Sequence, residues 1–176
     1  MSKVILYTAV SLDGYIAELD GSIAFLDDPQ YRLPEEDYGY SAFYDSIDTV
    51  VMGYNTFAQI QSFEGDYPYQ GKESVVLSSK PIADAPSGIE VCTDPCESRV
   101  AALKGEGKNV WIIGGGATNA ILHEKALIDE LYLTFLPITL GQGVPMFRAN
   151  KGHYQWSTEG VRTYPNGVVQ MHLVKK

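Results

Sequence analysis

The chain has 176 residues, of which 45% are apolar, and it carries 13 Lys and Arg against 22 Asp and Glu, a net charge of −9. This composition excludes an intrinsically disordered chain, and the length suits one domain over residues 1–176. The acidic balance argues against a nucleic-acid-binding protein, because neutralising phosphates requires clustered Lys and Arg.

We expect neither a membrane segment nor a metal site. No apolar run approaches the ~20 residues that span a bilayer. Val4–Val10 is too short for a signal peptide and contains Tyr7 and Thr8, so a cytoplasmic protein is expected. Cys92 and Cys96 have no second cluster of ligand residues beside them. They are interpreted as free thiols, with a disulfide or metal pair as the less favoured alternative.

Short β-rich runs alternate with helical or turn-rich segments, which is the pattern of a sheet with helices on its faces. The predicted strands of this first part are Val4–Val10, Thr49–Met52, Ser74–Leu77, Ile89–Cys92 and Val110–Ile113. Two of them contain the continuous apolar runs VVM and VWII. Such runs predict central parallel strands that are buried on both faces.

Helices are expected between these strands. A short helix over Ala42–Ile47 precedes the second strand, and Asn55 is expected to cap the next helix. The clearest helix start follows Thr93, with Asp94 as N-cap and Pro95 as the first helical residue. The predicted buried residues are Phe57 and Ile60 in the second helix, Val100 and Leu103 in the third, and Ala117, Ala120 and Ile121 in a fourth helix after the glycines at 114–116.

After Asp129 the pattern changes to strands only. Leu131–Leu136 is predicted as a strand, and 137–145 is a loop rich in Gly and Pro. Asn166-Gly167 between two strand-like runs predicts a type I′ hairpin, in which both central residues need positive φ. The expected fold class is therefore α/β, with a mixed, mainly parallel central sheet flanked by helices and a C-terminal antiparallel hairpin.

Three strand ends carry small, polar or basic residues that suit a phosphorylated ligand. Gly114–Gly116 follow one strand and open a helix, whose free N–H groups would favour an anion. A tight turn without a ligand is the alternative. Gly53 and Ser78–Lys80 follow two further strands. Because ligands bind at the carboxyl ends of strands in open α/β sheets, we expect an extended, polyphosphorylated ligand across all three. The glycines do not form the GxGxxG fingerprint of a standard Rossmann domain.

The ordered motifs VVMGYNTF, VVLSSKP, WIIGGGATNAIL and DELYLTFLPITLGQG resemble the dihydrofolate reductase superfamily, over about Lys3 to Val174. The SLDGYIA start and the PITLGQG loop are more similar to the branch that contains the reductase domain of the riboflavin-biosynthesis enzyme RibD. The resemblance implies a dihydrofolate-reductase-like fold and an NADPH-dependent oxidoreductase. It also implies a homodimer that pairs through the late strands.

The resemblance carries a set of cofactor-binding positions onto this chain, which line the nicotinamide, the pyrophosphate and the adenine ribose with its 2′-phosphate. These positions are Ala9, Ile16, Gly53, Tyr54, Asn55, Thr56, Ser78, Ser79, Lys80, Gly114, Gly115, Gly116, Ala117 and Thr118. Tyr54 and Ala117 stand where the superfamily usually has arginine, which removes two charge-assisted phosphate contacts. NADPH is the expected cofactor, and NADH is the alternative.

A hydride acceptor must also gain a proton, which a carboxyl group or an ordered water usually supplies. Asp37 lies where the superfamily places its substrate-binding carboxylate, and Thr134 matches the threonine that partners it. If Asp37 is desolvated, its pKa should rise. Asp13 in the SLDG turn is the second candidate. For both aspartates a plain loop or turn residue is the alternative interpretation.

The substrate implied by the resemblance is a small heterocyclic or sugar-phosphate compound, such as the riboflavin-pathway pyrimidine with its ribosyl phosphate. The candidates for its phosphate pocket are Arg32, Arg148 and Lys151. Dihydrofolate reductase is the alternative enzyme, although an acidic, Tyr-rich insert at 20–40 replaces the tryptophan-bearing loop of that enzyme. A nucleotide-binding protein of this fold without reductase activity is the non-enzymatic alternative.

Overall fold

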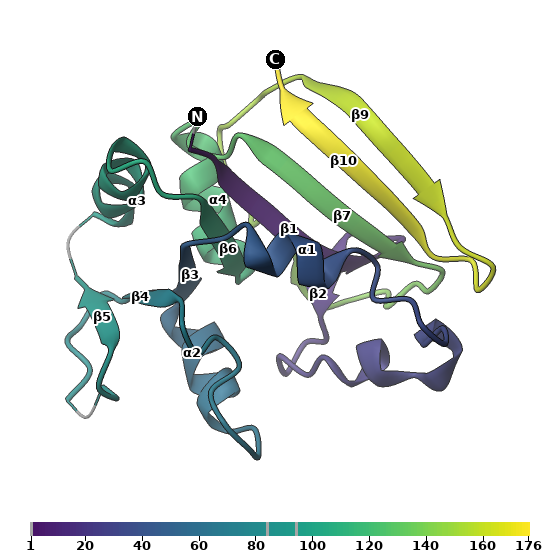
Figure 1. Ribbon diagram of the computed structural model, residues 1–176, viewed down its shortest axis with the longest axis horizontal. Helices are drawn as coiled ribbons and strands as arrows, with labels where there is room; N and C mark the ends of the chain where they lie inside the picture. The colour runs from purple at the N-terminus through teal and green to yellow at the C-terminus, as the bar shows by residue number, and fades with distance from the viewer. Residues whose placement is uncertain (1, 84, 94) are drawn as a thin grey trace.

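In the computed structural model, which describes residues 2–83, 85–93 and 95–176, eight strands form one sheet in the order β5-β4-β3-β6-β1-β7-β10-β9 (Figure 1). All neighbouring strands from β5 through β4, β3, β6 and β1 to β7 are parallel, whereas β10 pairs antiparallel with both β7 and β9. The predicted mixed α/β sheet is therefore confirmed. The strand bounds are β1 (Val4–Ser11), β3 (Thr49–Gly53), β4 (Glu73–Leu77), β5 (Ile89–Cys92), β6 (Val110–Gly114), β7 (Glu130–Leu136), β9 (Trp156–Thr163) and β10 (Val169–Lys175).

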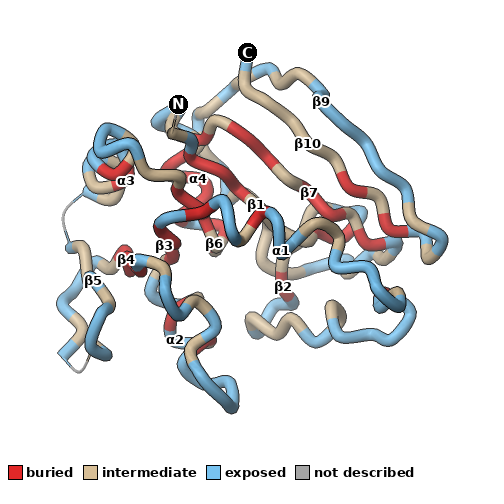
Figure 2. The backbone as a smooth tube through the Cα atoms, in the orientation of Figure 1, coloured by how far each residue is buried: buried red, intermediate tan, exposed pale blue. Residues whose placement is uncertain are grey.

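Within the described residues, four α-helices cover the two faces of the sheet. Successive side chains of a strand point to opposite faces, so Leu6 and Val51 face one core while Ile5 and Val50 face the other. The first core packs against α3 (Cys96–Gly105) and α4 (Gly116–Glu124), and the second against α1 (Tyr40–Asp45) and α2 (Tyr54–Gln61). Figure 2 shows the buried residues concentrated along the central strands.

The helix starts differ from the predicted ones. Helix α1 begins two residues earlier than expected, and the N-cap of α2 is Gly53, so Asn55 lies inside the first turn instead of capping it. Pro95 is the N-cap of α3 and not its first helical residue, and Asp94 lies outside the described residues. The buried residues predicted for α2 and α3 are confirmed.

The buried face of α4 was predicted only in part. Ala120 is buried as expected, but Ala117 is exposed and the side chain of Ile121 is 39% exposed. Thr118 and Asn119 are buried instead. Asn119 occupies a buried position because its Nδ2 donates to the carbonyl of Met146 at 2.8 Å. A hydrophobic pattern cannot identify a buried position that a hydrogen-bonded polar residue fills.

The C-terminal hairpin is present, but its turn is not type I′. Gly167 has a φ of 84°, whereas Asn166 is absent from the described non-glycine residues with positive φ. The amide of Gly167 donates to the carbonyl of Tyr164 at 3.0 Å, and the amide of Tyr164 donates to Val168 at 2.9 Å. The loop is therefore one residue longer than predicted. A two-residue turn would need an amide hydrogen at Pro165, and proline has none.

Short elements complete the molecule on the side where β1 ends. Strand β2 (Tyr15–Ala17) pairs with β8 (Val144–Pro145), which lies within the predicted 137–145 loop. Two 3₁₀ turns, η1 (Ala24–Asp27) and η2 (Pro29–Tyr31), follow β2. Among the described residues, no helix has the length and apolar character needed to cross a membrane.

Candidate functional site

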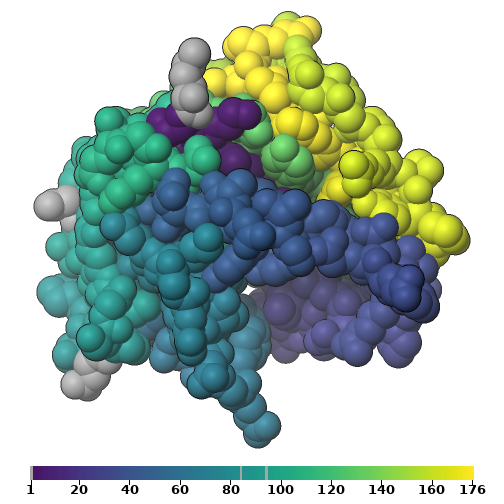
Figure 3. Space-filling model, in the orientation of Figure 1, coloured from purple at the N-terminus to yellow at the C-terminus, as the bar shows by residue number. Residues whose placement is uncertain are grey.

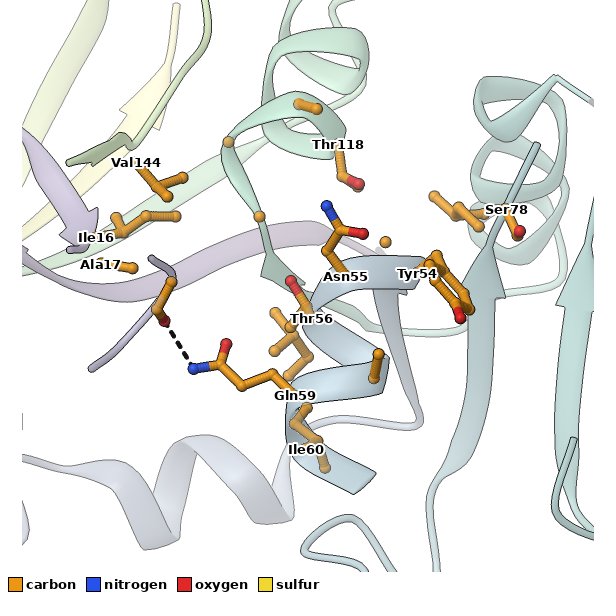
Figure 4. A pocket seen from close by; sticks show the side chains of 18 of the residues that line it. Ile16, Ala17, Tyr54, Asn55, Thr56, Gln59, Ile60, Ser78, Thr118 and Val144 are labelled. Atoms are coloured by element: carbon orange, nitrogen blue, oxygen red, sulfur yellow. Dashed lines mark hydrogen bonds between the residues drawn. The ribbon is translucent and has the colours of Figure 1, made fainter. Parts of the chain in front are cut away.

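A cleft of about 1910 Å³ opens where the parallel strands β1, β3, β4 and β6 end. One wall is α2, and the segment 19–27 forms the facing wall, side by side with α2 at the surface (Figure 3). The two walls are joined by Gln59 on α2, whose Nε2 donates to the carbonyl of Gly21 at 2.7 Å (Figure 4). The cleft thus lies at the sheet edge where the sequence predicted a ligand.

The cleft brings together almost all of the predicted cofactor positions. With the exception of Gly114, every one of them is among the lining residues. Gly114 has a φ of 123°, a conformation that favours glycine, so it shapes the turn that leads into α4. Figure 4 shows Asn55, Thr56 and Thr118 close together, with Ile16 and Val144 on the opposite side of the cleft.

Two helix N-termini meet in this cleft. Gly53 is the N-cap of α2 and Gly115 is the N-cap of α4, and no side chain caps either helix. A Cβ atom on Gly53 would lie 2.6 Å from Oγ1 of Thr118, so glycine permits this close approach. The first-turn N–H groups of both helices therefore need an outside partner, and their dipoles favour an anion.

The run of three glycines also has an intramolecular cause. A Cβ atom on Gly116 would lie only 2.1 Å from the carbonyl oxygen of Pro145, so the residue must be glycine for β8 to pack against α4. A Cβ atom on Gly115 would lie 3.4 Å from Oγ1 of Thr56, which is near ordinary contact. Gly115 therefore lines the cleft without such a packing restriction.

Both signs of charge line the cleft. Among the lining residues that the structure describes, the cations are Lys80, after β4, and Arg148, beside the N-terminus of α4. The carboxylates Asp20 and Asp27 also line the cleft, in the segment that faces α2. Arg32 lies outside the lining and pairs with Asp27 at 3.4 Å. Of the three residues predicted for a substrate phosphate, only Arg148 lines the cleft.

Asp37 does not have the environment that was predicted for a proton donor. It is exposed, lies outside the cleft lining and accepts hydrogen bonds from the amides of Gly39 at 2.8 Å and Ser41 at 2.9 Å. Hydrogen bonds from Ser41, and then from Gly39, lower the pKa of Asp37. The desolvation on which a raised pKa was conditional is absent, because Asp37 is exposed. The carboxylate satisfies amides at the start of α1, which is a capping role.

Thr134 is buried, but its partner is not Asp37. Its Oγ1 accepts a hydrogen bond from Nε2 of Gln170 at 3.1 Å, and the same Nε2 donates to the carbonyl of Tyr38 at 3.0 Å. Gln170 lies on β10, the neighbour of β7 in the sheet, so this network connects two strands. Thr134 lies outside the cleft lining.

Asp13 links the two motifs that mark the RibD branch. Its carboxylate accepts hydrogen bonds from Oγ of Ser11 at 2.6 Å and from the amides of Leu140 at 3.1 Å and Gly141 at 2.7 Å. These bonds, the one from Ser11 first, lower its pKa. Asp13 therefore holds the SLDG turn against the LGQG loop, and it lies outside the cleft.

Sequence reasoning missed the wall at 19–27 and Gln59, which bridges to it. Gln59 lies in α2 among residues with no chemical motif, and its partner Gly21 is 38 positions earlier. No local signal in the sequence relates the two. Arg148 was predicted, but as a residue for a substrate phosphate. The structure places it beside the N-terminus of α4.

Comparison with known proteins gives consistent results. The family model of the RibD C-terminal domain matches residues 2–170. The uncharacterized protein YwjB of Bacillus subtilis (strain 168) is 36% identical over 175 residues, which cover 98% of each chain. The crystal structure of a Shewanella sp. PV-4 protein assigned to riboflavin biosynthesis is similar with a TM-score of 0.86 and 31% identity, over 99% of both chains.

A more distant structure has the same fold. It is the Thermotoga maritima diaminohydroxyphosphoribosylaminopyrimidine deaminase/5-amino-6-(5-phosphoribosylamino)uracil reductase, with a TM-score of 0.74 and 15% identity. The similarity covers 99% of this chain and 57% of the Thermotoga chain. At this level of identity the comparison shows that the fold is shared.

Proposed function

The chain belongs to the RibD C-terminal domain family, a family of NADPH-dependent reductases, and on that basis we propose that it binds NADPH and reduces a small heterocyclic acceptor. The observation that carries the proposal is the meeting of two uncapped helix N-termini in a cleft at the ends of β1, β3, β4 and β6. This arrangement suits an extended ligand with a pyrophosphate.

The residues present fit a dinucleotide cofactor. The first turns of α2 and α4, after Gly53 and Gly115, would hold the pyrophosphate, because their N–H groups have no side-chain cap. The loop Ser78–Lys80 would hold the adenine ribose and its 2′-phosphate. Ala9 and Ile16 would pack against the nicotinamide. When bound, the cofactor supplies the hydride, and these residues bind and orient it.

NADH is the alternative cofactor, since two positions lack the usual charge. Tyr54 is 49% exposed on the first turn of α2 and lies near Ser78 (Figure 4). Ala117 is exposed on the first turn of α4. Neither residue can neutralise a phosphate, so within the proposed 2′-phosphate loop Lys80 is the residue that would supply positive charge.

The acceptor would enter between α2 and the segment 19–27. This part of the cleft combines apolar residues such as Ile60 and Phe63 with Asp20 and with Asp27, whose charge Arg32 partly offsets. Carboxylates repel a phosphate and attract cationic or hydrogen-bond-donating groups. We therefore propose a heterocyclic acceptor without a phosphate, and not the sugar phosphate that the resemblance implies.

A calorimetric titration of the purified protein with NADPH, and separately with NADH, tests the proposal. We expect micromolar binding of NADPH, followed by NADPH oxidation with one of a panel of pyrimidines and pteridines. Tight methotrexate binding would instead indicate a dihydrofolate reductase. Cofactor binding without turnover of any acceptor would indicate a nucleotide-binding protein, and binding of neither cofactor would overturn the proposal.

We further propose that the protein is a homodimer that pairs through the late strands, as the family resemblance implies. Strand β9 lies at the end of the sheet order, and Val161 on it is 53% exposed. An exposed strand at the end of a sheet can pair with a second copy. Sedimentation equilibrium would measure the mass, and a monomer at micromolar concentration would contradict this part of the proposal.

A further inference from the structure

We propose that Arg148 binds the pyrophosphate of the nicotinamide cofactor and replaces the positive charge that Tyr54 and Ala117 do not supply. This inference depends on the proposed function, because it assigns a residue to the same cleft. Arg148 follows β8 and belongs to no helix or strand. It therefore lies away from positions 54 and 117, at the starts of α2 and α4, where the superfamily usually has arginine.

The backbone around Arg148 is fixed against the first turns of α4. Its amide donates to the carbonyl of Gly116, the first residue of the helix, at 3.0 Å. Two residues earlier, the carbonyl of Met146 accepts from Nδ2 of Asn119 at 2.8 Å. The carbonyl of Pro145 packs against Gly116 so closely that no Cβ fits between them. These three contacts place Arg148 beside the N-terminus of α4.

The guanidinium of Arg148 is available to a ligand. The chain has four arginines, and Arg148 is the one that lines the cleft. Arg99 is engaged by Glu90 and Glu106, and Arg32 pairs with Asp27. Arg148 is exposed and forms no ion pair with any residue in 2–83, 85–93 or 95–176.

The position of Arg148 indicates which phosphate it would bind. The N-terminus of α4 meets that of α2 at the contact between Thr118 and Gly53, where the pyrophosphate is proposed. A guanidinium added there would form charge-assisted, bidentate hydrogen bonds to the same phosphates as the helix N–H groups. Lys80 lies on a different loop, after β4, beside the proposed 2′-phosphate. The two cations therefore serve separate phosphates.

This separation gives a test that uses both cofactors. NADPH and NADH share the pyrophosphate and differ in the 2′-phosphate. Calorimetric dissociation constants for both cofactors would be measured with the wild-type protein, Arg148→Ala, Arg148→Lys and Lys80→Ala. Lys151→Ala is the control, because Lys151 is an exposed cation that lies outside both the cleft and the proposed dimer strands. Thermal unfolding of each variant would confirm that it folds.

We expect Arg148→Ala to weaken both cofactors by about tenfold, which leaves the ratio of their affinities unchanged. Arg148→Lys should recover part of the loss, because lysine keeps the charge but not the bidentate geometry. Lys80→Ala should weaken NADPH more than NADH. The variant without Arg148 should also show a shallower dependence of NADPH affinity on salt concentration.

Three results would overturn the inference. The first is an Arg148→Ala variant that binds both cofactors within about twofold of Lys151→Ala. The second is a loss confined to NADPH, which would assign Arg148 to the 2′-phosphate. The third is a wild-type protein that binds neither cofactor, which would remove the proposed function together with the role of Arg148. In the first two cases the wild-type protein binds cofactor, so the proposed function stands.

Discussion

Replacing Gly116 with alanine should destabilise the protein. This is the opposite of the usual effect, because a glycine-to-alanine substitution within a helix stabilises the helix by up to about 1 kcal/mol. The new Cβ would lie 2.1 Å from the backbone oxygen of Pro145. A backbone atom cannot rotate away, so the segment around β8 and α4 must separate. The separation would strain or break the hydrogen bonds from the Arg148 amide to Gly116 and from Asn119 to Met146.

The size of the effect follows from these contacts. Two hydrogen bonds contribute about 0.5–1.5 kcal/mol each, and overpacking costs about 1–3 kcal/mol. After subtracting the gain in helix propensity, we expect the free energy of unfolding to fall by about 3 kcal/mol. Urea unfolding monitored by circular dichroism would measure it.

Gly105→Ala is the matched control. Gly105 is the last residue of α3, and a Cβ atom built on it meets no heavy atom within 4 Å. The same substitution there should leave stability unchanged or raise it by up to about 1 kcal/mol. Equal free energies of unfolding for Gly116→Ala and Gly105→Ala would refute the role assigned to the contact with Pro145.

Three further predictions concern the aspartates. Asp13→Ala should lower stability without changing NADPH affinity, and a loss of affinity alone would contradict the structural role. Because hydrogen bonds hold the pKa of Asp13 below its ordinary 3.8, its stabilising contribution is complete above that value and is lost as the pH falls through the folded-state pKa. The difference in urea midpoint between wild type and Asp13→Ala should therefore stay constant from about pH 7 to about pH 5 and shrink as the pH falls below about 4. Asp37→Asn should leave turnover within about threefold of wild type, and a fall of about a hundredfold would restore Asp37 as the proton donor. The riboflavin-pathway pyrimidine should be reduced with a higher kcat/KM after its phosphate is removed. The double variant Asp20→Asn, Asp27→Asn should bring the kcat/KM values of the two forms closer together. A preference of the wild-type protein for the phosphorylated form would contradict an acceptor site next to Asp20 and Asp27.

The central sheet could be predicted from the sequence because its signals are local. The runs around Val50 and Val110 are apolar without a break, and strands buried on both faces need such runs. Each predicted strand of the first part matches an observed one with a difference of at most one residue at either end. The ends of these strands then fix the position of the cleft, which is why most of the predicted cofactor positions fall in its lining.

Elements that depend on one backbone detail were predicted less well. Asn166-Gly167 has the composition of a type I′ turn, but Pro165 lacks the amide hydrogen that this turn would use. The N-cap of α2 is Gly53 and not the polar Asn55, because the helix start lies against Thr118 on α4, which requires a residue without a side chain. Pro165 thus prevents the turn that Asn166-Gly167 predicts, and Gly53 takes the cap position that Asn55 was expected to fill.

The carboxylates show why residue chemistry alone does not identify a catalytic group. Asp13 follows a strand near the ligand cleft, as a catalytic acid would, but its partners Leu140 and Gly141 lie 127 and 128 positions away. The carboxylate of Asp13 accepts hydrogen bonds from two loop amides that have no strand partner. Neither SLDG nor LGQG alone indicates that these amides need an acceptor. Asp37 is held in the same way by amides near α1. Both carboxylates are stabilised in the ionised form and lie outside the cleft. In the reduction proposed above, the proton for the acceptor would therefore come from a group that lines the cleft or from water within it. The described carboxylates that line the cleft are Asp20 and Asp27.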